Sequence, residues 1–275
     1  MKMIFFKKLS LWFLILIVGV SRSTFAQEKL GIAFLPADES NVSIFIVLDD
    51  LPEQYFLFTV PEIITSRNFK QGMFNADMKA WTIKNNQATR KVKKGPYKYQ
   101  VMMTLQEEKD KFWVNWQIKF ENNSKDTLVD IAAFNCLTMH HAPLFKDTTM
   151  IRTWVRNNVG EVVSLKDVAK VQGEGRRTMQ FYPAAGGLDL SESPWLRDWR
   201  VISPIQLSGN TMWLNSKDGK WKVETIVDGQ TAYFFNNWEG DHGCIHASPL
   251  IAKELKPMQT AVVKGRFVFS KINSD

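Results

Sequence analysis

The stretch Phe112–Phe120 (FWVNWQIKF) decides the fold. Every second side chain in it is apolar, and the positions between carry Asn115, Gln117 and Lys119, with Trp113 as the exception. An α-helix would scatter the apolar residues around its circumference, whereas a β-strand places them all on one face. The stretch therefore predicts a half-buried β-strand.

The neighbouring segments extend this strand into a sheet. Tyr97–Leu105 alternates in the same way, and the charged run Glu107–Lys111 joins it to the first stretch, which predicts an antiparallel hairpin. The polar run Asn122–Asp126 is typical of a turn. It leads into Thr127–Met139, which is largely apolar at both odd and even positions. Such a segment is expected in the middle of a sheet, covered on both faces.

Period-two alternation continues to the end of the chain, and only Leu165–Val171 and Leu250–Leu255 are interpreted as single helical turns. No linker rich in Pro, Gly or Ser and no internal repeat divides the chain. We therefore predict an all-β protein, in which residues 27–275 form one large antiparallel β-sandwich. The further strand candidates are Val42–Leu48, Tyr55–Val60, Met150–Asn157, Thr178–Tyr182, Thr211–Leu214, Trp221–Val227, Thr231–Asn237 and Thr260–Phe269.

The N-terminus has the pattern of a secretory signal peptide. Three lysines precede the uncharged run Leu9–Val20, and Thr24 and Ala26 are small residues suited to a cleavage after Ala26. As a helix this run would span about 18 Å, too short for a hydrocarbon core of about 30 Å. We expect residues 1–26 to be removed and the mature chain to be exported, to the periplasm or the extracellular space, without stable membrane insertion.

The positive charge of the chain belongs largely to this N-terminal segment. The formal charge is +7, and the segment holds four basic residues and no acidic one, which leaves a charge of +3 on residues 27–275. The one basic cluster, Arg90–Lys94 (RKVKK), is interpreted as a solvated strand end or loop. A nucleic acid partner is therefore not expected.

Histidines and cysteines are concentrated in two places. The four histidines fall in segments 140–141 and 242–246. Cys136 lies shortly before the first segment, and Cys244 lies within the second. Each segment lies at the end of a predicted strand. We therefore expect the two segments to meet in space.

Several kinds of site could form where the two segments meet. His140 or His141 with His242 and His246 could supply three imidazoles to a metal ion, but the spacing matches no structural zinc motif, and no cofactor is expected.

The cysteines leave two further alternatives. A Cys136–Cys244 disulfide would close a loop of about 108 residues and stabilise the fold by about 4–5 kcal/mol in an oxidising compartment. Alternatively, both cysteines are buried and free in adjacent strands.

A fourth alternative is an open cleft with acid and base groups. His140, His141 and His246, with Glu239 and Asp241, are the candidate catalytic residues, because imidazoles and carboxyls move the hydroxyl protons of a sugar. Flat aromatic rings cover the apolar face of a pyranose. The candidate substrate-binding residues are Arg152, Trp154, Trp195, Trp199 and Trp238.

The run Tyr97–His140, which includes WVNWQIKFENNSKDTLVDIAAFNCLTMHH, resembles the middle of galactose-mutarotase-like β-supersandwich proteins. The turn LKPMQT before the last strand, AVVKGRFVF, is similar to the closing strand of that fold class. The resemblance implies that His140 or His141 is the histidine of a sugar cleft and that Glu239 or Asp241 stands for a catalytic acid.

The sequence as a whole favours an exported protein that binds or acts on carbohydrate at a cleft of His, acidic and Trp residues. Two alternatives remain: a non-enzymatic envelope protein with structural histidines and cysteines, and a metal-dependent hydrolase.

Overall fold

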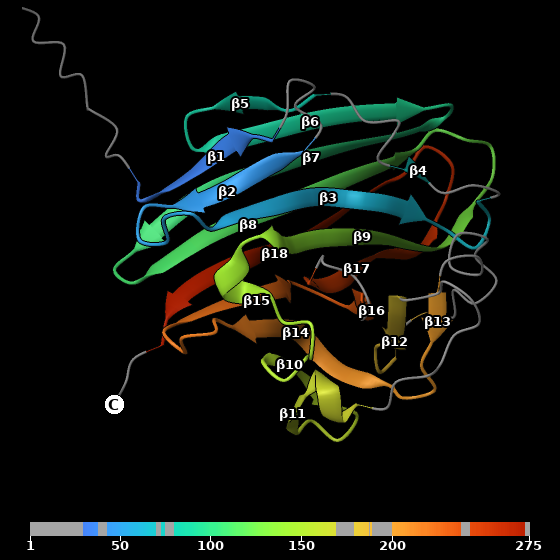
Figure 1. The fold of residues 1–275 in the computed structure, drawn as a ribbon. Coiled ribbons are helices and arrows are strands. Elements are labelled where there is room, and N and C mark those ends of the chain that lie inside the picture. The colour runs from blue at the N-terminus through green and yellow to red at the C-terminus, as the bar shows by residue number, and fades with distance from the viewer. Residues whose placement is uncertain are drawn as a thin grey trace, which may run out of the picture.

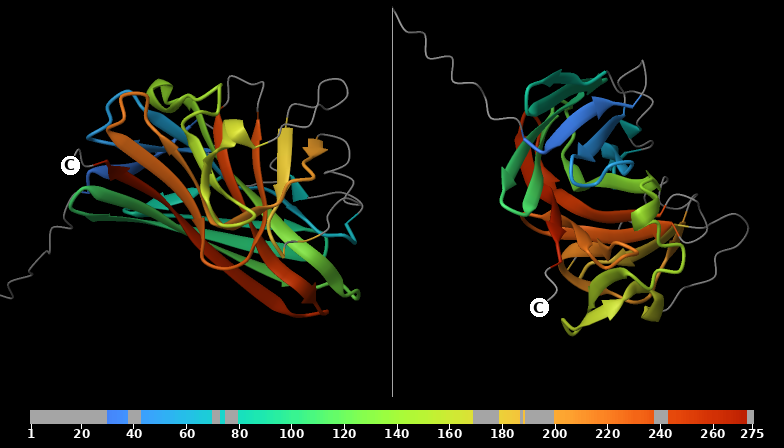
Figure 2. Two further views of the ribbon diagram at one scale, coloured as in Figure 1. Left: turned by 90° about the horizontal axis from the view of Figure 1, so that it is seen from below. Right: turned by 60° about the vertical axis from the view of Figure 1, so that its left-hand side comes forward.

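The computed structural model describes residues 30–37, 43–69, 73–74, 80–168, 179–186, 188, 200–237 and 243–272. Within these residues the strands form two nine-stranded sheets that pack against each other (Figure 1). Figure 2 shows the same arrangement from two further directions. The prediction of a large all-β sandwich is confirmed.

The first sheet contains the two segments that carry histidine and cysteine. Its strand pairs are antiparallel apart from β12 with β13, which run parallel. The strands in spatial order are β1 (Ile32–Pro36), β2 (Ile44–Leu48), β3 (Tyr55–Thr65), β9 (Leu128–His141), β17 (Cys244–Leu255), β16 (Thr231–Asn237), β12 (Met179–Pro183) and β13 (Arg200–Ile202), with β4 (Met73–Phe74) paired to β3.

The second sheet is antiparallel throughout. Its strands in spatial order are β11 (Val162–Ser164), β10 (Thr153–Asn157), β14 (Leu207–Asn215), β15 (Trp221–Val227), β18 (Thr260–Lys271), β8 (Lys111–Asn122), β7 (Tyr97–Glu108), β6 (Gln87–Lys94) and β5 (Thr82–Lys84). Two short 3-10 helices, η2 (Pro143–Phe145) and η3 (Leu165–Asp167), complete the described elements.

The predicted hairpin is the pair β7 and β8. The two strands stay in register from Tyr97 opposite Asn122 to Glu108 opposite Lys111, and burial alternates residue by residue along β8. Local alternation was enough to predict this hairpin because its inner face is apolar and its outer face is polar.

The main core lies between the two sheets. Phe56 and Phe58 of β3 contact Phe269 and Phe267 of β18, with ring centroids 4.8 and 4.6 Å apart. All four rings are buried, and each contributes about 1.5–3 kcal/mol by leaving water. Through these contacts the centre of the first sheet packs against the centre of the second.

Strand β9 is buried on both faces, as predicted for a central strand. Its odd-numbered residues Ala133 and Leu137 face the main core, whereas Ala132 and Phe134 belong to a second apolar cluster on the outer face of the first sheet. That outer cluster consists of Ile63, Ala132, Phe134, Phe181, Leu188, Ala232, Tyr233 and Phe235.

The helical turn predicted at Leu250–Leu255 is wrong, because these residues form the second half of β17. Glu254 and Leu255 pair with Val129 and Leu128 of β9, so tertiary pairing overrides the helix-like spacing of IAKEL. The other predicted turn is present as η3. Among the described residues, no helix has the length and hydropathy needed to cross a lipid bilayer.

Arg90 corrects the interpretation of the basic cluster. Lys91 and Lys93 are exposed as expected, but Arg90 faces the core and is 1% exposed. Its guanidinium donates a hydrogen bond to the carbonyl oxygen of Val60 at 2.8 Å and lies 4.2 Å from the ring centroid of Trp81. Burial lowers the pKa of Arg90 to about 10, so the side chain still carries its charge at neutral pH.

Candidate functional site

The two segments with histidine and cysteine meet in the first sheet, so this prediction is confirmed. Strands β9 and β17 are hydrogen-bonded neighbours, with Cys244 opposite Thr138. The same register continues along the pair and places His246 across from Cys136. On the other side of β9, Cys136 pairs with Thr59 of β3.

Cys136, Cys244 and His246 form a compact group, called here the Cys–His cluster. The two Sγ atoms lie 3.9 Å apart, and one potential ligand atom from each residue lies within 4.8 Å of the others. A disulfide has an S–S length of about 2.05 Å, so the two cysteines are not joined by a disulfide in this structure. Cys244 and His246 are buried, whereas Cys136 is partly exposed.

The imidazole of His246 has a fixed orientation. Its Nδ1 lies 3.0 Å from the carbonyl oxygen of Phe235, the cross-strand neighbour on β16. A carbonyl only accepts hydrogen bonds, so Nδ1 carries the hydrogen and Nε2 of the neutral ring keeps its lone pair. The ring also stacks on Phe235 with centroids 3.6 Å apart. Backbone and ring together hold the imidazole in one pose.

The two thiols influence each other's protonation. Contact with Cys136 lowers the pKa of the Cys244 thiol, burial opposes this effect, and the neighbouring His246 and Thr138 also lower the pKa. The same contact, together with burial and the nearby Cys244 and Glu62, raises the pKa of Cys136. Cys244 therefore has the lower pKa of the two, because the S–H of Cys136 points at its sulfur.

Glu62 is the acidic neighbour of the cluster. It lies on β3, where the pairing with β9 shifts register between Thr59 and Ile63, next to the cis Val60–Pro61 bond. Burial raises the pKa of the Glu62 carboxyl, the nearby His246 opposes this rise, and Cys244 adds to it. The residue remains partly exposed, so the site reaches solvent on this side.

Sequence reasoning missed Glu62, although a signal was present. It is an acid inside the run YFLFTVPEIIT, where the surrounding side chains are nearly all apolar. A lone carboxyl in a central strand is uncommon, because burying a charge without a partner is unfavourable. That observation alone would have marked residue 62 as a candidate.

One wall of the site is aromatic. Phe181 and Phe235 stack in parallel with ring centroids 4.8 Å apart, and Phe134 meets both rings edge-on. The imidazole of His246 stacks on Phe235, so this buried aromatic cluster lies directly beside the Cys–His cluster.

His140 and His141 do not join the cluster. Both are exposed at the end of β9, with ring centroids 4.5 Å apart, and His141 contacts Phe45. His140 lies four residues beyond Cys136, which corresponds to about 13 Å along a strand. The structure thus brings His246 together with the cysteines and leaves the histidine pair at the rim.

Arg152 and Trp154 lie apart from the Cys–His cluster. The Arg152 guanidinium donates to the carbonyl oxygens of Leu144, Lys146 and Asn215, and its backbone N–H donates to Asp147 at 2.8 Å. These contacts tie the η2 loop to β14. Trp154 belongs to β10 of the second sheet.

The remaining candidates from the sequence lie outside the described residues. They are Trp195, Trp199, Trp238, Glu239, Asp241 and His242.

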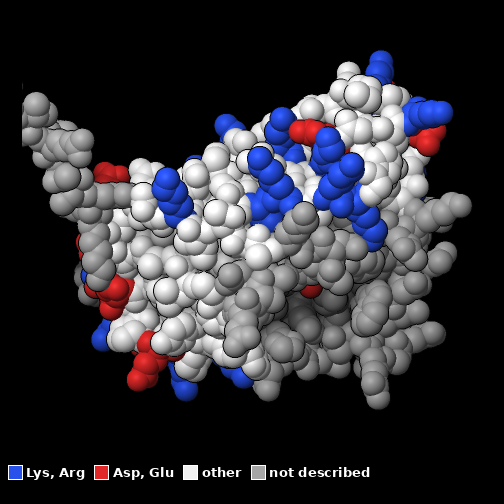
Figure 3. Space-filling model, turned by 90° about the horizontal axis from the view of Figure 1, so that it is seen from above, with Lys and Arg blue, Asp and Glu red and all other residues white. Residues whose placement is uncertain are grey.

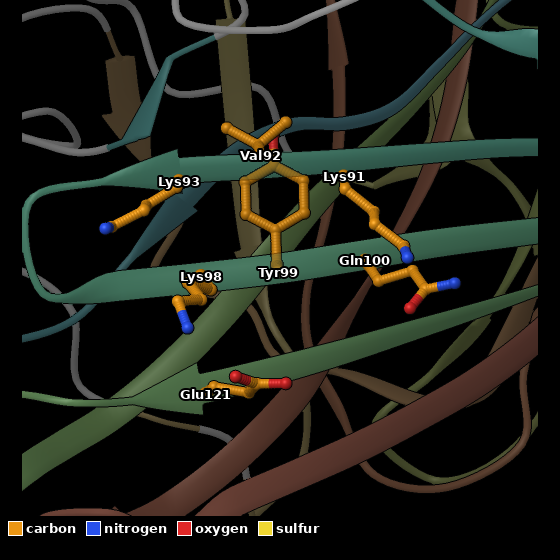
Figure 4. Close-up of a pocket in the computed structure, with 7 residues that line it drawn as sticks. All are labelled: Lys91, Val92, Lys93, Lys98, Tyr99, Gln100 and Glu121. Atoms are coloured by element: carbon orange, nitrogen blue, oxygen red, sulfur yellow. The ribbon is translucent and has the colours of Figure 1, made fainter.

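A second surface feature is basic. Lysine and arginine side chains are prominent on the face seen in Figure 3. A shallow depression of about 560 Å³ on the second sheet is flanked by Lys91, Lys93 and Lys98 and by Gln100 and Glu121 (Figure 4). Its lining contains no histidine or cysteine and a single acidic residue, Glu121, so the Cys–His cluster is the stronger candidate for chemistry.

Several solved structures resemble this chain at low sequence identity, and galactose-mutarotase-like proteins are among them. The Slr1438 protein from Synechocystis sp. PCC 6803 has a TM-score of 0.44 and 9% identity, over 89% of this chain and 96% of that one. A galactose mutarotase related enzyme from Lactobacillus acidophilus has a TM-score of 0.42 and 9% identity, over 88% and 98%. A galactose mutarotase-like protein from Clostridium acetobutylicum has a TM-score of 0.38 and 7% identity, over 85% and 94%. No family model and no curated protein matches the sequence.

Proposed function

We propose that this protein is exported and binds, or acts on, a carbohydrate at the outer face of the first sheet, around Glu62. The observation that carries the proposal is the convergence of Glu62 and His246 from β3 and β17, the two strands that flank β9. A sugar requires several hydrogen-bonding groups at one place, next to an apolar surface that covers its ring. Glu62 and His246 supply a carboxyl and an imidazole at one place, beside the aromatic cluster of Phe134, Phe181 and Phe235.

A sugar that binds here raises the melting temperature of the protein. At ten times its Kd, a ligand adds about 1.4 kcal/mol, which corresponds to about 3–6 °C for a chain of this size. Glu62→Gln keeps the shape of the side chain and removes its charge, so we expect it to lose at least half of the shift. Thermal unfolding with a panel of mono- and oligosaccharides measures this.

Glu254→Gln is the matched control for that experiment. Glu254 is exposed near the far end of β17, so its substitution should leave the sugar-dependent shift unchanged. A wild-type protein that responds to no sugar across a broad panel would refute the proposal.

Export has its own test. In a cell fractionation of the natural host, we expect the protein outside the cytoplasm, with a mature mass that corresponds to a chain beginning at Gln27. A cytoplasmic protein of full length would contradict this part of the proposal and leave the sugar experiment unaffected.

A non-enzymatic envelope protein is the second candidate function. The observation in its favour is the burial of His246, which is 2% exposed and hydrogen-bonded to the backbone, as a structural histidine would be. This candidate predicts no sugar-dependent shift and no effect of Glu62→Gln beyond a change in stability.

A further inference from the structure

We propose that the Cys–His cluster binds one thiophilic divalent metal ion of the Zn²⁺ type through Cys136 Sγ, Cys244 Sγ and His246 Nε2. The proposal shares His246 with the proposed carbohydrate site, but it is tested without sugar, by metal binding and by protection of the thiols. Thiolate and imidazole are the ligands that Zn²⁺ prefers, and two thiolates with one imidazole form a known catalytic ligand set.

The distance between the sulfurs fits a shared metal ion. Two thiolates bound to tetrahedral Zn²⁺, each at about 2.3 Å, lie about 3.8 Å apart. The observed Sγ–Sγ distance is 3.9 Å. A disulfide would require the sulfurs to approach to about 2.05 Å and to lose two electrons to an oxidant. The strands already hold the two sulfurs at the separation that a metal ion requires.

The orientation of His246 is that of a metal ligand. Histidines that bind metals almost always donate their other ring N–H to a carbonyl or carboxylate, which fixes the tautomer and the ring plane. His246 Nδ1 makes such a bond to the Phe235 carbonyl, and the stacked Phe235 ring prevents the imidazole from turning. The lone pair of Nε2 is therefore available without rearrangement.

Charge balance also favours a cation. The sheet places two thiols, one of them 7% exposed, beside an imidazole and near Glu62. Binding of M²⁺ releases the thiol protons to solvent and leaves two thiolates, a neutral imidazole and the cation, with a net charge of zero. A neutral group is far less unfavourable in a buried position than separate charges.

The described residues supply three ligands and leave a fourth coordination position unfilled. Among the described histidines, cysteines and acids, only Cys136, Cys244 and His246 lie within mutual ligand distance. Glu62 interacts electrostatically with His246 and Cys244, so it lies near the cluster but outside the ligand group. Three protein ligands with an open position are typical of catalytic metal sites.

Cobalt titration of the reduced full-length protein tests the proposal. Co²⁺ adopts the tetrahedral geometry of Zn²⁺, and thiolate ligands give it an intense charge-transfer absorption in the near ultraviolet. We expect one equivalent of Co²⁺ to produce this absorption, one equivalent of Zn²⁺ to abolish it, and both metals to protect the two thiols from alkylation. A reduced, folded protein that gives no thiolate–Co²⁺ absorption would overturn the proposal.

Variants assign the ligands. Cys136→Ser, Cys244→Ser and His246→Gln should each weaken binding by more than about 100-fold, since loss of a supporting residue alone weakens it 10–100-fold. His140→Ala is the matched control, because this exposed histidine lies on the same strand and outside the cluster, and it should bind as wild type does. Full loss of binding in His140→Ala with retention in His246→Gln would also overturn the assignment. Thiol protection in the wild-type protein answers the question even where a serine variant does not fold.

Discussion

Gly265→Ala is expected to prevent stable folding of the protein. A Cβ atom at this position would lie 2.2 Å from Cζ2 of Trp116 and 2.3 Å from the carbonyl oxygen of Ile226. Gly265 is on β18, the middle strand of the second sheet, directly opposite Trp116 of β8. One contact is with the backbone, so rotation of a side chain alone does not relieve the overlap. We expect a loss of about 4 kcal/mol or more in the free energy of unfolding, at the severe end of single substitutions.

Urea unfolding followed by tryptophan fluorescence measures this loss, and Gly229→Ala is the matched control. Nothing lies within 4 Å of a Cβ built on Gly229, so the same chemical change there should alter stability by about 0.5 kcal/mol or less. If Gly265→Ala is as stable as Gly229→Ala, the close packing of Trp116 over β18 does not hold in solution.

Arg90→Met is the second substitution with a large expected effect. It leaves the Val60 carbonyl without its 2.8 Å hydrogen bond and removes the cation from the face of Trp81. A buried polar group left without a partner costs about 1–3 kcal/mol. A desolvated cation–π contact contributes about 2 kcal/mol. We expect a loss of about 2–4 kcal/mol in the free energy of unfolding.

Lys91→Met removes the same charge from the neighbouring exposed position and should have little effect. Val60 is two residues before Glu62, so Arg90→Met should also weaken any sugar-dependent stabilisation. Stability equal to or above that of wild type would mean that desolvation of the guanidinium outweighs its contacts, as it does for some buried ion pairs.

The parts of the fold that could be predicted from the sequence are the strands in which apolar and polar residues alternate. The hairpin of β7 and β8 follows from period two between its turn residues, and strand Trp221–Val227 has the predicted bounds. Strand β17 could not be predicted in this way. It is covered on both faces over its first half, so IHASPLI shows no alternation, and its exposed end AKEL has helix-like spacing.

The candidate site was predictable only in part. The positions of the cysteines at two strand ends predicted that Cys136, Cys244 and His246 would meet. The histidine pair at 140–141 was expected with them, but four residues of extended chain carry it about 13 Å away. The contribution of Glu62 depends on a register shift in β3, which the sequence does not reveal. Arg90, in contrast, shares its parity with the buried Ala88 and Val92, which was a usable signal.

The last two strands of the chain occupy the middle of the two sheets: β17 between β9 and β16, and β18 between β15 and β8 (Figure 1). Neither sheet can therefore be completed until residues 244–271 have been synthesised. Contacts between residues so distant in sequence slow folding, because the chain entropy of closing a long loop is lost before any contact forms. The strands on either side of β17 and β18 can be joined only after these two strands have formed. The proximity of Cys244 to Cys136, which the reactivity of the two thiols can follow, therefore marks the last step of folding.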